Sequence, residues 1–154
     1  MKSPENISLV DKMSKRRDSG CVIIIKENKL LVIKRHCEDH DIVDYYVLPG
    51  GGIEEGETPE QTAIREAKEE LSINVKLDKL LFEFNNSGNI EHYFLVTTYS
   101  GKVTPSSEVT TLDPTDTYEP IWQDLNTLIE INLLPEKAKL LIIDYAKAQG
   151  IIKG

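Results

Sequence analysis

Three glutamates on one short helical stretch are the residues of this chain best suited to chemistry. Glu66, Glu69 and Glu70 follow a glycine-rich segment at Gly50–Gly52. At about 100° per residue, the three carboxylates lie within about a third of the helix circumference. Like charges at these spacings repel by roughly 0.2–0.5 kcal/mol per pair. The cluster is therefore either a solvated acidic face or a set of oxygen ligands for Mg²⁺ or Mn²⁺.

The segment before the glutamates indicates where their helix begins. Thr58 is suited to the N-cap, since its hydroxyl can accept a free backbone N–H. Pro59 takes the first helical position, where a missing N–H has no cost, and Gln61 completes a capping box. The sequence predicts a glycine loop, then a helix whose acidic side borders an apolar stripe made of Ala63, Ala67 and Leu71.

The spacing of these residues resembles the Nudix box of the Nudix hydrolases. The matching positions are Gly51, Glu57, Arg65-Glu66-Ala67 and Glu69-Glu70, and Leu48-Pro49-Gly50-Gly51 resembles the entry to the box. Ser72 departs from the family, which usually has glycine just past the helix, where a left-handed residue is useful. Ser72 should cost some local stability, but it removes no ligand. The order of elements around the box extends the resemblance to most of the chain.

The resemblance implies a divalent-metal site that holds Mg²⁺ or Mn²⁺. Its expected ligands are the carboxylates of Glu66, Glu69 and Glu70 and the backbone carbonyl of Gly50. We expect Glu119 as an extra ligand, because it stands at the start of a predicted strand that would hold it rigidly.

Four box residues are expected to take part in catalysis: Glu57, Arg65, Glu66 and Glu69. Arg65 should orient a carboxylate, that of Glu57 or Glu69, although a plain i,i+4 pair with Glu69 is the alternative. Glu57 is expected to contact the ligand residues without binding the metal itself. The general base varies within the family, and we expect Glu66, with Glu108 and Glu119 as alternatives.

Three further residues are candidates for substrate binding. Arg35 could reach a phosphate or could be a solvated strand end. Tyr46 could stack on a base or pack in the core, where strand aromatics are common. Glu108 belongs to a polar segment, Thr104–Tyr118, whose length predicts a mobile lid at the substrate pocket.

Nudix hydrolases cleave a nucleoside diphosphate linked to a group X, with water attacking a phosphorus of the P–O–P bridge. The ADP-ribose and coenzyme A branches carry additional motifs that this chain lacks. We therefore expect a nucleoside di- or triphosphate, with dinucleoside polyphosphates and nucleotide sugars as alternatives. A non-catalytic nucleotide-binding module is a rival reading, and so is an isomerase of the isopentenyl diphosphate type. Neither Cys21 nor Cys37 stands in the context that such an isomerase needs.

Composition restricts the class of protein. The chain has 154 residues, 40% of them hydrophobic and 29% charged, which is typical of one globular domain. The net charge of −8 argues against a basic patch that binds nucleic acid or a membrane surface. We expect a cytoplasmic protein with reduced thiols, without a transmembrane helix or visible signal peptide. The resemblance implies a nucleotide-like small molecule as the partner, and a homodimer is left open.

We expect a loose N-terminal segment over residues 1–15 and a single Nudix domain over 16–154. The fold class is α+β, a mixed β-sheet sandwiched between helices (α/β/α), as the resemblance implies. The last helix should open at Pro135 with an apolar stripe of Leu140, Leu141, Ile143 and Tyr145, after a short helix capped by Asp124. Strands are expected over 21–25, 30–35, 45–48, 73–84, 92–99 and 118–122.

Overall fold

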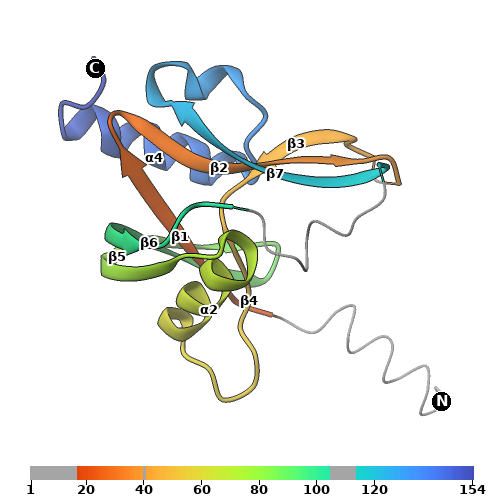
Figure 1. The fold of residues 1–154 in the computed structure, drawn as a ribbon. Helices are drawn as coiled ribbons and strands as arrows, with labels where there is room; N and C mark the ends of the chain where they lie inside the picture. Colours follow the sequence, from red (N-terminus) through yellow and green to blue (C-terminus); the bar gives the residue numbers. More distant parts are fainter. Residues whose placement is uncertain (1–16, 40, 105–113) are drawn as a thin grey trace, which may run out of the picture.

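The computed structural model describes residues 17–39, 41–104 and 114–154. Neither the predicted N-terminal segment, over 1–15, nor Glu108 belongs to these residues. The elements, in chain order, are β1 (Ser19–Lys26), β2 (Lys29–Cys37), β3 (Asp44–Val47), β4 (Gly50–Gly52), α2 (Pro59–Leu71), β5 (Asn74–Asn86), β6 (Asn89–Ser100), β7 (Asp116–Asp124), the 3₁₀ helix η1 (Leu125–Glu130) and α4 (Glu136–Ala148) (Figure 1).

Strand β1 joins the two halves of the sheet. It pairs in parallel with β6, and it pairs antiparallel with β4 and, near its end, with β2. Strand β2 in turn lies between β3 and β7, while β5 pairs with β6 at the other side. The sheet is therefore mixed, as predicted. Figure 1 shows β1 running between the group of β2, β3 and β7 and the group of β4, β5 and β6.

Two hydrophobic clusters cover the two faces of the sheet. On one side, Val22 and Ile24 of β1 are buried with the apolar stripe of α2. On the other, Ile23 is buried with residues of η1 and α4. Successive strand residues point to opposite faces, so a β-branched run in β1 supplies both clusters. The predicted arrangement of a sheet between helices is confirmed.

Helix α2 begins and ends as its local sequence predicts. The Thr58 hydroxyl accepts the Gln61 N–H at 3.1 Å, and the Gln61 side chain accepts the Thr58 N–H at 2.9 Å. Ser72 ends the helix in the left-handed conformation, with φ 63° and ψ 30°. The position at which the family usually has glycine therefore requires the conformation that glycine adopts without strain.

Two details of the predicted elements are wrong. In the predicted stripe of α4, Ile143 is buried and Leu141 and Tyr145 pack against the core, but Leu140 is 45% exposed. The buried side also includes Ala138, Ile142 and Ala146, which were not predicted. In addition, β2 continues to Cys37 and β7 starts at Asp116, so the pairing of these two strands is longer than the sequence suggested. Most of the predicted lid, residues 105–113, lies outside the described residues.

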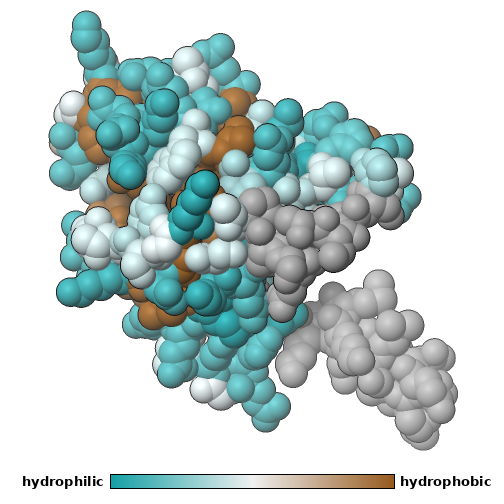
Figure 2. Space-filling model, in the orientation of Figure 1, coloured by the Kyte–Doolittle hydropathy of each residue, from teal (hydrophilic) through white to brown (hydrophobic). Residues whose placement is uncertain are grey.

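Surface features agree with the acidic composition. On the face shown in Figure 2, hydrophilic side chains cover most of the surface, and hydrophobic ones show through in separate small areas. Both cysteines are free thiols, as expected. None of the helices in the described residues is long and apolar enough to cross a membrane.

Candidate active site

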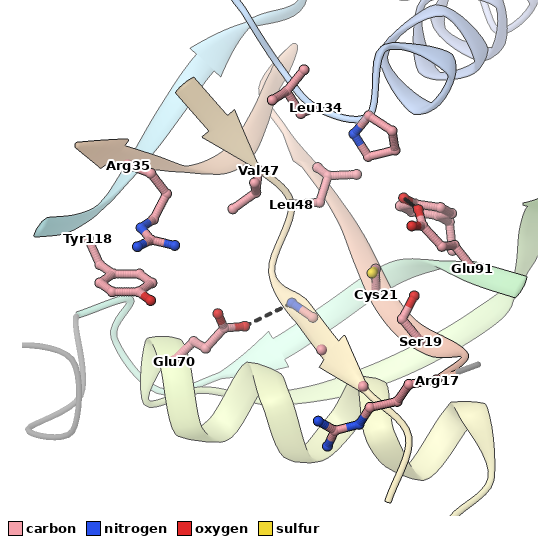
Figure 3. A pocket seen from close by; sticks show the side chains of 15 residues that line it. Arg17, Ser19, Cys21, Arg35, Val47, Leu48, Glu70, Glu91, Tyr118 and Leu134 are labelled. Atoms are coloured by element: carbon pink, nitrogen blue, oxygen red, sulfur yellow. Dashed lines mark hydrogen bonds between the residues drawn. The ribbon is translucent and has the colours of Figure 1, made fainter. Parts of the chain in front are cut away.

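A pocket of about 490 Å³ opens between the glycine strand β4 and the strands around it. Figure 3 shows Arg35, Tyr118 and Glu70 on one side of it and Glu91 on the other, with Cys21 and Leu48 between them. The residues lining it are Arg17, Ser19, Cys21, Arg35, Val47, Leu48, Gly50, Gly51, Gly52, Glu70, Glu91, Tyr93, Tyr118, Leu134 and Pro135.

Glu70 connects α2 to the glycine strand. Its carboxylate accepts the backbone N–H of Gly50 at 2.8 Å. Burial raises the pKa of Glu70 to about 8, which outweighs this hydrogen bond, and the neighbouring Glu66 and Glu69 raise it further. The charged form of this carboxylate is thus short of positive partners, and a cation placed beside it would stabilise that form.

Arg65 holds the other box carboxylates together. Its guanidinium donates to Glu57 at 2.6 and 3.0 Å, to Glu66 at 2.9 Å and to Glu69 at 3.1 Å. It also donates to the carbonyl of Gly52 at 3.3 Å. The i,i+4 pair with Glu69 is therefore only one part of a network, and the expected orientation of Glu57 and Glu69 by Arg65 agrees with this geometry.

Glu57 is held by donors on several sides. Besides Arg65, it accepts the Thr62 hydroxyl at 2.6 Å and the Glu54 N–H at 3.1 Å. These hydrogen bonds, led by that of Arg65, lower the pKa of Glu57 to about 2. A carboxylate that accepts so many donors is fixed in place, so Glu57 anchors Arg65, which in turn anchors Glu66 and Glu69.

Gly51 leaves room for the Glu66 carboxyl group. A Cβ atom at Gly51 would lie 2.5 Å from the Cδ and Oε1 atoms of Glu66. Burial raises the pKa of Glu66, while Arg65 acts in the opposite direction. The absence of a side chain at Gly51 therefore lets the glycine strand approach the acidic side of α2 closely.

Arg35 is a cation that lines the pocket on the same side as Glu70 (Figure 3). Its guanidinium lies 3.6 Å from the centre of the Tyr118 ring and forms a 2.6 Å ion pair with Asp116. The Arg35 side chain is 13% exposed. The alternative of a solvated strand end does not fit this low exposure, whereas the position of Arg35 in the pocket is compatible with phosphate binding.

Two other candidates lie away from the pocket lining. Glu119 is exposed and stands opposite Lys34 in the register of β7 with β2. The preceding Tyr118 lines the pocket, and successive strand residues point to opposite faces, so Glu119 points away from the pocket. This position does not support Glu119 as an extra metal ligand. Tyr46 packs against the hydrophobic cluster formed with η1 and α4, which agrees with the alternative that Tyr46 belongs to the core. The third candidate, Glu108, lies outside the described residues.

Tyr118 and Glu91 line the pocket without having been singled out from the sequence. Tyr118 is adjacent to the chosen Glu119, and only the phase of the strand distinguishes them. Glu91 follows a turn, and only residues distant in the sequence show that it belongs to the pocket. Neither the phase of the strand at Tyr118 nor the neighbours of Glu91 can be predicted from the local sequence.

The candidate ligands, Glu66, Glu69, Glu70 and the carbonyl of Gly50, have the chemistry that a divalent cation requires. Within the described residues, no three His, Cys, Asp or Glu side chains are arranged so that they could hold an ion as they stand. The reason is visible in the contacts: Arg65 engages Glu66 and Glu69, while Glu70 accepts the N–H of Gly50. All the donors are oxygens, which suits Mg²⁺ or Mn²⁺, and the raised pKa of Glu70 shows the charge that a cation would offset.

Comparisons with known proteins agree with this geometry. The NUDIX domain family matches residues 14–142. An 8-oxo-dGTP diphosphatase of Proteus vulgaris is 33% identical over 87 residues, 54% of this chain and 77% of that protein. An ADP-ribose pyrophosphatase of Methanocaldococcus jannaschii is 44% identical over 59 residues, 38% of this chain and 34% of that protein. The structure of a MutT NUDIX hydrolase from Burkholderia pseudomallei shares the fold with a TM-score of 0.63 at 20% identity, over 84% of this chain and 98% of that one. The chain therefore belongs to the Nudix hydrolase family.

Proposed function

We propose that this protein is a metal-dependent pyrophosphohydrolase that cleaves a nucleoside di- or triphosphate by attack of water at phosphorus. The observation that carries the proposal is the Arg65 network, which holds Glu66 and Glu69 next to a half-buried Glu70 at the edge of a pocket. A purely solvated acidic face would need neither an arginine anchored by Glu57 nor a glycine strand without side chains against it.

A bound Mg²⁺ or Mn²⁺ would neutralise phosphate oxygens and make a bound water more acidic. Glu66, Glu69, Glu70 and the carbonyl of Gly50 would hold it. Arg65 and Glu57 keep Glu66 and Glu69 oriented, so that less motion is needed when substrate arrives. Glu66 accepts a proton from the attacking water, whose oxygen forms the new P–O bond. The bridging P–O bond breaks, and the bridging oxygen leaves with the other phosphate product.

Arg35 is the residue that we assign to the substrate phosphates. Its side chain is already immobilised by Tyr118 and Asp116, so that little side-chain entropy is lost when it binds an anion. It faces the pocket on the side of Glu70, near which the reacting phosphorus would have to lie (Figure 3). Stacking and ion pairing suit a planar guanidinium better than an ammonium group.

A mononucleotide fits the pocket better than the alternatives do. The volume of about 490 Å³ is within the range of sites that bury one small ligand. A dinucleoside polyphosphate would need a second base site. The relative from Proteus vulgaris is named for a nucleoside triphosphate, 8-oxo-dGTP, which supports this class. The cytoplasmic location, the homodimer and the absence of nucleic-acid partners remain predictions from sequence.

The test is a panel of nucleoside di- and triphosphates, dinucleoside polyphosphates and nucleotide sugars, incubated with Mg²⁺ or Mn²⁺ and read by product chromatography. We expect a nucleoside di- or triphosphate to be hydrolysed fastest, with loss of activity in chelator. Preferential cleavage of a nucleotide sugar would show that nucleotide sugars, and not nucleoside di- or triphosphates, are the substrate class. Nucleotide binding without any product would instead favour the non-catalytic module.

A further inference from the structure

Glu91 at the start of β6 is a pocket carboxylate that the proposed chemistry does not use. It lines the pocket on the side away from Arg35 and Tyr118 (Figure 3). A negative charge there repels phosphate, while two arginines of the lining attract it: Arg35, and Arg17, which lies against Gly52 of the glycine strand. A nucleotide that places its phosphates near Arg35 and Glu70 therefore directs its base towards Glu91.

Neighbouring side chains hold the Glu91 carboxylate in a fixed orientation. The Tyr93 hydroxyl donates to Oε1, and the side-chain amide of Asn86 donates to Oε2 at 2.8 Å. An ionised carboxylate has about four lone-pair sites, so each oxygen keeps capacity for one more donor. Within the described residues Glu91 takes part in no ion pair with a lysine, arginine or histidine, which leaves this capacity to a ligand.

The walls next to Glu91 suit a flat heterocycle. Leu48, Leu134 and Pro135 line the same pocket and supply apolar surface. Burial is the main cause that raises the pKa of the Cys21 thiol to about 12, so Cys21 adds a neutral group and not a second charge. A ring bound between such surfaces presents its polar edge to Glu91.

We propose that Glu91 selects the base by accepting two adjacent N–H donors, the 2-amino-4-oxopyrimidine edge that guanine shares with pterins. This inference rests on the proposed function, because it assumes that the pocket binds a nucleotide-like phosphate. Adenine and cytosine place an acceptor nitrogen beside their amino group, which a carboxylate repels. Uracil and thymine offer one N–H between two acceptor oxygens. Only the guanine-type edge matches both oxygens of Glu91.

The test compares kcat/KM for GTP, ITP and ATP. A bidentate pair of hydrogen bonds discriminates by about 5–150-fold. We therefore expect wild type to prefer GTP over ATP by a factor in this range. ITP, which lacks the 2-amino group, should fall between them.

Two variants separate base selection from stability. In Glu91→Gln, the amide keeps the size but offers only one acceptor oxygen, so the ratio of kcat/KM for GTP to that for ATP should fall at least about fivefold. The matched control is Glu83→Gln on the neighbouring strand, an exposed carboxylate paired with His92 that does not line the pocket. This control should keep the wild-type ratio.

An equal loss for GTP and ATP in Glu91→Gln would show that Glu91 supports only the structure, and it would overturn the proposal. Hydrolysis of all three nucleotides at similar rates by wild type would do the same while leaving the proposed function intact. If no nucleotide is cleaved, the proposed function fails. In that case, calorimetric binding of GTP and ATP to wild type and Glu91→Gln still decides the base preference.

Discussion

Substitution of Gly51 by alanine separates the position of Glu66 from the stability of the fold. The new Cβ would lie 2.5 Å from the Glu66 carboxyl group, against about 3.4 Å for ordinary contact, so that group must move by about 0.9 Å. A misplacement of about 1 Å in an active site can cost about 10²-fold in rate. The displaced atoms end a flexible side chain, and Gly51 has no positive φ, so we expect a stability loss below about 1 kcal/mol.

The assay is the rate of nucleoside triphosphate hydrolysis with Mg²⁺, together with a thermal melt of the same samples. Gly88→Ala is the control, because Gly88 has φ +97° in a turn with nothing within 4 Å of an added Cβ. It should lose about 1 kcal/mol or more of stability through backbone strain and keep its activity. A Gly51→Ala variant that retains wild-type activity would refute the reasoning that the glycine strand sets the position of Glu66.

Three further predictions concern single side chains. Glu57→Gln should lower the melting temperature near neutral pH. The difference from wild type should shrink as pH falls from 4.5 to about 2, because a carboxyl group with a depressed folded-state pKa stabilises the fold only in its ionised form. A difference in melting temperature that is independent of pH across this range would contradict the assignment. Glu119→Gln should keep the wild-type rate and metal dependence, as nucleotide kinetics can check, since Glu119 lies on the face away from Tyr118. Ser72→Gly should raise stability by about 0.5–1 kcal/mol in denaturant melts by removing left-handed strain, and no gain would mean that Ser72 adopts its conformation without cost.

Local signals made the box helix predictable. The hydroxyl of Thr58, the ring of Pro59 and the side chain of Gln61 each act within one turn, so the sequence alone determines where α2 begins. The helical period likewise places Glu66 and Glu70 on the acidic side. These predictions needed no knowledge of distant residues, and the described geometry agrees with them.

Long-range features were not predictable in the same way. Tyr118 and Glu119 differ only in strand phase, and that phase is set by the pairing of β7 with β2. In α4, consecutive apolar residues allow more than one stripe, and packing against η1 and the sheet selected the one that buries Ala138 and Ile142. Glu91 became a candidate only when folding brought β6 to the pocket.

The most direct test of the carboxylate site is the shift in melting temperature that Mg²⁺ produces in wild type and in Glu70→Gln. A ligand at a hundredfold its dissociation constant stabilises the folded state by about 2.7 kcal/mol. We predict that wild type gains stability on this scale when chelator is replaced by saturating Mg²⁺. Glu70→Gln, which keeps the shape of the side chain and removes its charge, should be at least as stable in chelator and gain less from Mg²⁺. Equal shifts in the two proteins, or no shift in wild type, would contradict a metal site at Glu66, Glu69 and Glu70.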